Sequence, residues 1–384
     1  MTVPADMEKM GAILLIHWTF RPTTGGVESH IADLAHAMAA RGCRVVVLTG
    51  EEKPLISDRY SIISTSLLEL ATIKKNPIPE SDYFYLFKEC LEKIIVTHQV
   101  RTIHGHNLHH FHSAPALAVE AIRKQYGVRV FHTFHETWPD LLREEPVYRS
   151  WNGNYTVSRH VQQECESRLG FSPALRLLGV NTETFRSKTE CFTSGLLPTI
   201  FHPARLLPWK GVEISVRALA MLRERGHPAK LVLTDTQRIA DWDDELIAYR
   251  ERILNLIVEL RVTSLVRFET ASYADMPGLY ESADIVVYPT IGDEPYGLVP
   301  IEAMSCARPI IASVSGGIPE TVADGITGYL VPRGNPEELA SRIAGLISDP
   351  RQARNLGAAG RHRAELLFDA RRYVSALLDD FAEA

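Results

Sequence analysis

Two pairs of charged residues in the second half of the chain have the types and spacing of a site for phosphate and hydroxyl groups. Arg205 and Lys210 lie in the segment FHPARLLPWKG, residues 201–211, and Glu294 and Glu302 lie in GDEPYGLVPIEAM, residues 292–304. A guanidinium offers a planar fork and an ammonium a mobile point charge, which together suit a diphosphate. Carboxylates accept hydrogen bonds from sugar and ribose hydroxyls. A solvated surface loop is the alternative interpretation of each segment.

Glycine pairs ahead of helical patterns form a second group of candidates. Gly25 and Gly26 lie in TTGGVE, residues 23–28, and a similar SGGIPE stands at residues 315–320. Backbone N–H groups at such a helix start can bind an anion. The first segment is neither a GxGxxG motif nor a P-loop. A plain tight turn is therefore the alternative.

Alternating strand and helix patterns place these residues on connections between strands and helices. Short apolar runs predict strands, and apolar residues at helical spacing predict helices between them. Residues 44–48, RVVVL, are typical of a strand buried on both faces of a parallel sheet. The sequence predicts an α/β fold with doubly wound parallel sheets, and such sheets bind ligands at the carboxyl ends of their strands. The expected strands cover residues 12–16, 44–48, 102–103, 128–131, 199–201, 231–233, 264–268, 285–288 and 309–312, and helices are expected over 31–38, 87–97, 114–126 and 212–224.

The length of 384 residues indicates two large domains. Residues 186–198, rich in Ser, Thr, Lys and Gly, have the composition of a linker. We expect one domain over residues 1–190 and a second over 191–363. An amphipathic helix is expected within residues 364–384, packing back on the first domain.

Charge and cysteine content exclude several other classes of protein. A net charge of −6 disfavours nucleic acid as a partner. The apolar run at residues 12–16 is too short for a signal peptide or a membrane span. The five scattered cysteines form no CxxC pair, so we expect reduced thiols and a cytoplasmic protein without membrane insertion.

These motifs, in this order, resemble the retaining nucleotide-sugar glycosyltransferases of family GT4. Gly179-Val180-Asn181 with Phe185 is similar to the GVD…F segment of that family, and Glu294 and Glu302 reproduce its EX7E segment. The resemblance spans residues 14 to 345. It implies the GT-B fold, in which two Rossmann-like domains face a central cleft. The first domain then belongs to the acceptor and the second to the nucleotide sugar.

The resemblance also implies roles for individual residues. Arg205 and Lys210 hold the donor diphosphate and neutralise the leaving nucleotide, Glu294 binds donor sugar hydroxyls, and Glu302 binds the ribose. The remaining donor contacts implied are Gly25, Gly26, Tyr296, Gly297, Leu298 and Val299. The nucleotide sugar is a co-substrate, with UDP as the expected nucleotide, and no cofactor is implied. Thr234-Asp235-Thr236 stands where many relatives have a Gly-rich turn, which leaves base contacts open there.

Seven of the fifteen histidines lie between residues 104 and 135. A metal cluster is one interpretation, but no carboxylate or cysteine stands at ligand spacing, and the resemblance implies a diphosphate neutralised by cations. We therefore predict no metal site. The resemblance puts His135 close to the transferred sugar, as a catalytic residue, and His106 facing the acceptor. A structural buried histidine is the alternative for both.

The segment after His135 indicates the kind of acceptor. Glu136, Asp140, Glu144 and Glu145 are accompanied only by Arg143. If Glu136 and Glu144 line the entrance, their charge favours a soluble acceptor that bears an amine. An ordinary acidic surface loop is the alternative. Two other functions also stay open, namely a sugar-nucleotide epimerase of the same fold and a non-catalytic sugar-nucleotide-binding subunit.

Overall fold

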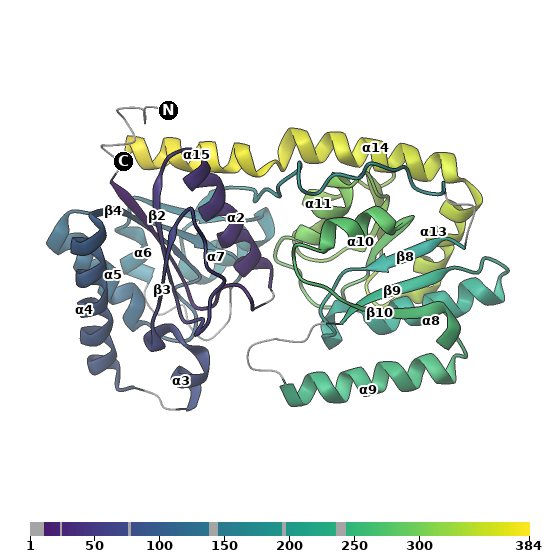
Figure 1. Ribbon diagram of the computed structural model, residues 1–384, viewed down its shortest axis with the longest axis horizontal. Helices are drawn as coiled ribbons and strands as arrows, with labels where there is room; N and C mark the ends of the chain where they lie inside the picture. The colour runs from purple at the N-terminus through teal and green to yellow at the C-terminus, as the bar shows by residue number, and fades with distance from the viewer. Residues whose placement is uncertain (1–10, 24, 76–77, 138–144, 194–196, 236–242) are drawn as a thin grey trace. The chain divides into compact units, whose positions relative to one another are not determined.

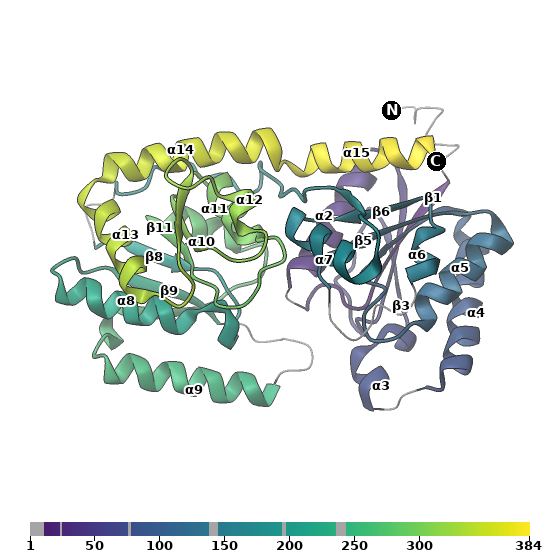
Figure 2. The ribbon, with the colours of Figure 1, turned by 180° about the vertical axis from the view of Figure 1, so that it is seen from behind.

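The computed structural model describes residues 11–23, 25–75, 78–137, 145–193, 197–235 and 243–384. The chain divides into two compact units, coloured by residue number in Figure 1. Unit 1 comprises Met1–Leu178 with Ala370–Ala384, and unit 2 comprises Gly179–Asp369. Figures 1 and 2 show helices on both faces of the sheet in each unit. The predicted doubly wound α/β class is confirmed.

Unit 1 contains a seven-stranded parallel sheet of order β3-β2-β1-β4-β5-β6-β7. Its strands are β1 (Ala12–His17), β2 (Arg44–Thr49), β3 (Ser61–Ser64), β4 (Val100–His106), β5 (Arg129–Phe134), β6 (Gly153–Thr156) and β7 (Ala174–Leu175). Its helices are α2 (Gly26–Ala40), α3 (Leu70–Lys75), α4 (Glu80–His98), α5 (Ala114–Tyr126), α6 (Glu145–Arg149), α7 (Arg159–Leu169) and α15 (Ala370–Glu383). The strand order reverses between β1 and β4, which is where open α/β sheets bind ligands.

The C-terminal helix α15 packs on unit 1 against α2. Its apolar face buries Phe381, whose ring centroid lies 4.5 Å from that of Phe131 on β5. At its polar edge, Asp380 accepts hydrogen bonds from Nε and Nη2 of Arg176. Helix α15, yellow in Figure 1, therefore completes the core of unit 1 although it is the last element of the chain.

Unit 2 contains a six-stranded parallel sheet of order β10-β9-β8-β11-β12-β13. Its strands are β8 (Thr199–His202), β9 (Lys230–Asp235), β10 (Val266–Thr270), β11 (Ile285–Tyr288), β12 (Ile310–Ser313) and β13 (Gly328–Val331). Its helices are α8 (Val212–Glu224), α9 (Asp243–Glu259), α10 (Met276–Ser282), α11 (Leu298–Ser305), α12 (Ile318–Thr321), α13 (Pro336–Ser348) and α14 (Pro350–Leu367). Here the order reverses between β8 and β11, so the residues after these two strands share one edge of the sheet.

The boundary between the units falls at residues 178–179, whereas the sequence placed it at residue 190. Phe185 is fully buried, with its ring centroid 5.8 Å from that of Tyr280 in unit 2. Arg308, also buried, donates hydrogen bonds to Ser187 Oγ and to the Thr189 carbonyl. The polar composition of residues 186–193 resembles that of a linker. The residues that hold Phe185 and this stretch in unit 2, Tyr280 and Arg308, lie more than 80 positions away, so the local sequence gives no sign of these contacts.

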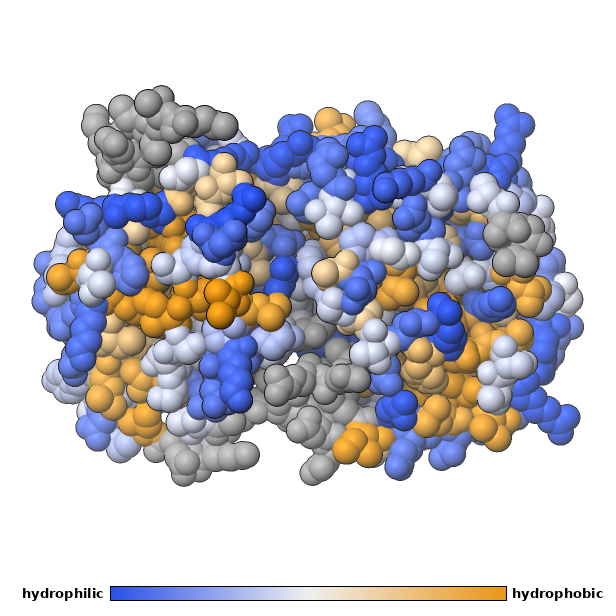
Figure 3. Space-filling view, in the orientation of Figure 1, coloured by the Kyte–Doolittle hydropathy of each residue, from blue (hydrophilic) through white to orange (hydrophobic). Residues whose placement is uncertain are grey.

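The described helices include none that is long and apolar enough to cross a lipid bilayer. On the face drawn in Figure 3, apolar and hydrophilic side chains are intermixed over both units. Exposed apolar side chains on α4 include Tyr85, Leu86 and Val96, and the ion pairs Lys88–Glu92 and Lys93–Glu89 lie on the same helix. The helix thus carries four acidic residues and two lysines rather than the basic surface typical of membrane-binding helices.

Candidate active site

Three side chains at the carboxyl edge of the unit 2 sheet form a closed triangle of hydrogen bonds. Lys210 ends a short 3-10 helix after β8, Tyr288 is the last residue of β11, and Glu294 follows in the loop before α11. Lys210 Nζ donates to Tyr288 Oη and to Glu294 Oε2, both at 2.7 Å. The Tyr288 hydroxyl donates to the same Glu294 Oε2, also at 2.7 Å. The side chains of Lys210 and Glu294 are each 14% exposed, so this ion pair is largely shielded from water.

Glycines allow the loops around this triangle to approach each other. Gly211 follows Lys210 at φ +75°, and a Cβ there would lie 2.0 Å from the Pro289 carbonyl oxygen. A Cβ on Gly316 would lie 2.0 Å from the Glu294 carbonyl oxygen, which also accepts a hydrogen bond from Gly317 N. Glu294 N in turn donates to Ser315 Oγ at 3.1 Å. The SGG segment therefore holds the backbone of Glu294.

Electrostatics keep Glu294 ionised and Tyr288 protonated. Burial raises the pKa of Glu294, but the charge of Lys210, the hydrogen bonds from Lys210 and Tyr288, and the charge of Arg205 outweigh it and leave the pKa below its usual value. Burial and the negative charge of Glu294 raise the pKa of Tyr288 well above its usual value. Because the charge of Arg205 acts on both groups, the predicted cations and the first carboxylate come together at this edge.

The second carboxylate, Glu302, lies on α11 and is 8% exposed. Its Oε2 accepts a 2.6 Å hydrogen bond from the hydroxyl of Tyr280, a fully buried residue of α10. Helix α11 begins after Gly297, which has φ +94°, so the N–H groups of Leu298 and Val299 lie in its first turn. These N–H groups have no carbonyl partner within the helix and are suited to an anion. Tyr296, just before them, is buried.

Unit 1 brings together His30, His106 and His135. His106 ends β4, His135 directly follows β5, and their Nδ1 and Nε2 atoms lie 3.0 Å apart. His30 comes from α2, and one ligand atom of each of the three residues lies within 4.8 Å of the others. All three are buried, and burial is the main cause that lowers their pKa values, for His30 to about 3. Neutral imidazoles can each donate or accept a hydrogen bond and can also ligate zinc. The sequence analysis did not foresee this grouping because His30 lies outside the histidine-rich stretch.

The remaining predicted residues of unit 1 have simpler surroundings. Gly25 directly precedes α2, which begins at Gly26. A Cβ on Gly25 would lie 2.0 Å from Glu28 Oε2, so the carboxylate of Glu28 lies beside the N-terminus of this helix. Glu136 is half-buried, and its carbonyl oxygen accepts from Nε2 of His109. Glu144 lies outside the described residues.

Sequence analysis did not identify Tyr280 and Tyr288 as functional candidates. Their contacts to Glu302 and Glu294 link positions 22 and 6 residues apart, on elements whose packing the sequence pattern did not specify. The one available signal was a phenol that ends the otherwise aliphatic strand IVVY, residues 285–288.

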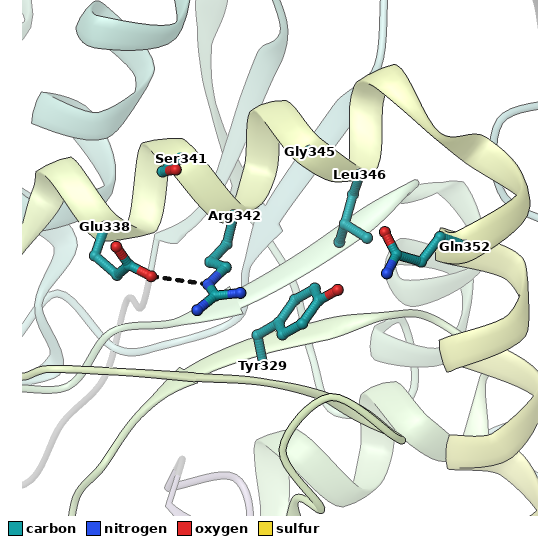
Figure 4. A pocket seen from close by; sticks show the side chains of 7 residues that line it. All are labelled: Tyr329, Glu338, Ser341, Arg342, Gly345, Leu346 and Gln352. Atoms are coloured by element: carbon teal, nitrogen blue, oxygen red, sulfur yellow. Dashed lines mark hydrogen bonds and ion pairs between the residues drawn. The ribbon is translucent and has the colours of Figure 1, made fainter.

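A separate hollow of about 380 Å³ lies on another part of unit 2 (Figure 4). Its lining includes Arg342, whose guanidinium stacks over the Tyr329 ring and pairs with Glu338. Since none of the predicted site residues lines this hollow, it takes no part in the candidate site.

Two family models together cover most of the chain. The one described as Glycosyl transferases group 1 matches residues 194–363, and the one described as Glycosyltransferase Family 4 matches residues 24–183. They correspond to most of unit 2 and of unit 1, respectively.

Curated relatives include a mannosyltransferase and a glycosyltransferase. A GDP-mannose-dependent alpha-(1-6)-phosphatidylinositol monomannoside mannosyltransferase from Mycolicibacterium smegmatis is 31% identical over 224 residues, 54% of this chain and 56% of that protein. A D-inositol 3-phosphate glycosyltransferase from Paenarthrobacter aurescens is 24% identical over 392 residues, 94% of this chain and 93% of that protein. The chain thus spans about half the length of the first of these relatives.

Solved structures share the fold of the whole chain. The sucrose-phosphate synthase of Thermosynechococcus elongatus matches with a TM-score of 0.79 at 23% identity, over 97% of this chain and 98% of that one. Anabaena HepE in complex with UDP and glucose matches with a TM-score of 0.76 at 18% identity, over 97% and 100% of the two chains. The two family matches show that the chain belongs to the glycosyltransferases of family GT4, and the solved structures show that it has the GT-B fold.

Proposed function

We propose that this chain transfers a sugar from a nucleoside diphosphate donor to an acceptor hydroxyl, with retention of anomeric configuration. The observation that carries the proposal is the pairing of Lys210 with Glu294 beside Arg205. Cations bind the diphosphate, and the carboxylate accepts hydrogen bonds from sugar hydroxyls. One site can therefore hold both the sugar and the diphosphate of the donor, the two groups joined by the bond that breaks.

The proposed reaction takes place on one face of the sugar. The bond between the anomeric carbon and the diphosphate oxygen breaks, and the acceptor oxygen bonds to the same carbon from the same side. The leaving phosphate oxygen takes the acceptor proton, and Arg205 and Lys210 stabilise the negative charge that grows on it. His135 and Gly26 of unit 1 are proposed to bind the transferred sugar and the diphosphate. This scheme needs no metal ion, and metal independence is part of the proposal.

For the donor we propose UDP first and GDP second. HepE was solved with UDP and glucose, whereas the relative with 31% identity is named as GDP-mannose-dependent. A thermal-shift series with UDP, GDP, ADP and dTDP tests the choice, because a nucleotide at 100 times its dissociation constant adds about 2.7 kcal/mol of stability. A larger shift with GDP than with UDP would reverse the order.

For the acceptor we propose a soluble small molecule, with an amine-bearing one preferred. Glu136 is the member of the acidic segment whose side chain the structure describes, and it supports the preference. The Paenarthrobacter relative is named for a phosphorylated inositol, which carries negative charge where an amine carries positive charge. Charge reversal at Glu144 and Glu145 should raise KM for an aminated acceptor, more strongly at low salt, and leave the donor KM unchanged. A preference for a phosphorylated or lipid acceptor would rule out the amine.

We also propose a cytoplasmic location. All five cysteines are free, and four of them are buried. Unpaired thiols are typical of a reducing compartment.

A further inference from the structure

We propose that Tyr288 is a positioning residue of the donor site, which fixes Lys210 and Glu294 so that each presents one polar atom to the donor. The inference rests on the proposed transferase function. The geometry that points to it is the triangle described above, in which three polar groups contact one another at 2.7 Å.

The hydrogen-bonding capacity of each group shows what the triangle leaves available. A phenol has one hydrogen to donate, which goes to Glu294, and its oxygen accepts from Lys210. Lys210 uses two of its three N–H groups and retains one for a phosphate oxygen. Both hydrogen bonds to Glu294 fall on Oε2, so within the described part of the chain Oε1 retains its capacity for a sugar hydroxyl.

The position of Tyr288 explains why it can hold the side chains of Lys210 and Glu294 in one orientation. It is 3% exposed at the end of a fully buried strand, and a tyrosine side chain has few rotatable bonds. Lysine and glutamate side chains are long and lose more rotamer freedom when they are held in one geometry. A bare Lys–Glu pair can rotate about its single contact, whereas contacts to a third, rigid group remove that freedom.

Several charged or titratable groups surround the phenol and set its behaviour with pH. The charges of Glu294, Arg205 and Glu302 act on Tyr288, Lys210 donates to it, and the His202 ring centroid lies 6.4 Å away. Burial lowers the pKa of His202 to about 3, so it stays neutral over the working range. The group whose ionisation depends on the phenol is therefore Glu294, since the hydrogen bond from Tyr288 helps to lower its pKa.

The test compares Tyr288→Phe with the wild-type chain. Loss of the hydrogen bond should lower kcat/KM at least ~10-fold, because hydrogen bonds to charged groups are among the stronger ones. It should also raise the pKa of Glu294, so that activity on acidification is lost at a higher pH than in the wild type. In the Glu294→Gln background the same substitution should cost much less, because the two residues act together.

Tyr249→Phe on α9 is the matched control. Tyr249 is 3% exposed, and no hydrogen bond from its hydroxyl to another side chain is found among the described residues, so the control removes a buried phenol oxygen outside the site. It should leave kcat/KM and the pH profile unchanged. If Tyr288→Phe does not fold, Tyr288→Leu, which continues the aliphatic strand, takes its place.

The outcomes separate this inference from the proposed function. A folded Tyr288 variant with the pH profile and kcat/KM of the wild type would overturn the role of Tyr288, and so would fully additive losses with Glu294→Gln. Wild-type protein that neither binds UDP or GDP in calorimetry nor releases nucleotide from a donor would overturn the proposed function itself.

Discussion

The Tyr280 hydroxyl donates a 2.6 Å hydrogen bond to Glu302 Oε2 and so joins helix α10 to helix α11. Tyr280 is itself held by Arg308, whose Nε donates to its carbonyl oxygen and whose Nη2 donates to Ser187 and Thr189. The segment around Ser187 and Thr189, near the start of unit 2, is thus connected through Arg308 and Tyr280 to the carboxylate that we propose for the ribose.

Tyr280→Phe should therefore weaken donor binding more than it slows the chemical step. Without the hydroxyl, the carboxylate of Glu302 loses a hydrogen-bond donor. Because Glu302 is only 8% exposed, water replaces that donor poorly, and the orientation of the carboxylate is less fixed. We expect donor KM to rise about 10-fold with a smaller change in kcat. Steady-state kinetics with varied donor check this, with Tyr249→Phe as the control, and an unchanged donor KM would disprove the link to Glu302.

Lys210→Ala and Glu294→Gln should each lower kcat by at least ~10²-fold without unfolding the chain, because both act on charge or orientation in the transition state. Arg205→Lys should not restore activity to wild-type level, since the planar fork is lost. The exposed Lys230, at the start of β9, gives a matched control as Lys230→Ala. Circular dichroism reports on folding, and wild-type turnover in either site variant would remove its assigned role.

Activity should persist in EDTA, since Arg205 and Lys210 carry the positive charge that the diphosphate needs. The His30, His106 and His135 grouping makes the measurement informative, because it is the place among the described residues where a metal could be held. Metal analysis of the purified protein should find less than one equivalent of zinc. Loss of activity in EDTA that magnesium or manganese reverses would contradict this expectation.

Phe381→Ala should destabilise unit 1 by about 3–5 kcal/mol, the usual cost of removing a large buried aromatic side chain. Phe381 is fully buried and packs on Phe131 although it lies near the end of the chain. Leu367→Ala is a suitable control because that leucine is 42% exposed at the end of α14. Urea unfolding measures the difference, and equal stability of the two variants would show that α15 does not belong to the unit 1 core.

The sequence predicted the strands that carry the site because they are short, continuous apolar runs. The strand at Ile285–Tyr288 and the helices over Ala114–Tyr126 and Val212–Glu224 have the predicted bounds. Strands β3, β6, β7 and β13 were missed. Each has only two to four residues with at most a short apolar run, and all four lie at or next to the edge of their sheet.

The candidate site was predictable only as far as residue type and motif order allow. Arg205, Lys210 and Glu294 could be grouped because each follows a predicted strand of one parallel sheet. Tyr280 could not be paired with Glu302, nor His30 grouped with the other two histidines, because each lies on a helix whose inward-facing side is set by packing within its own unit.

The most direct test of the proposed function is anomer-resolved ¹H NMR of the products formed from UDP-sugars and GDP-sugars with a panel of hydroxyl acceptors. We predict release of one nucleoside diphosphate per glycoside formed, with the anomeric configuration of the donor kept in the product. An inverted anomer would contradict the retaining mechanism. Epimerised sugar without transfer, or binding of the nucleotide with no turnover on any donor, would contradict the transferase itself.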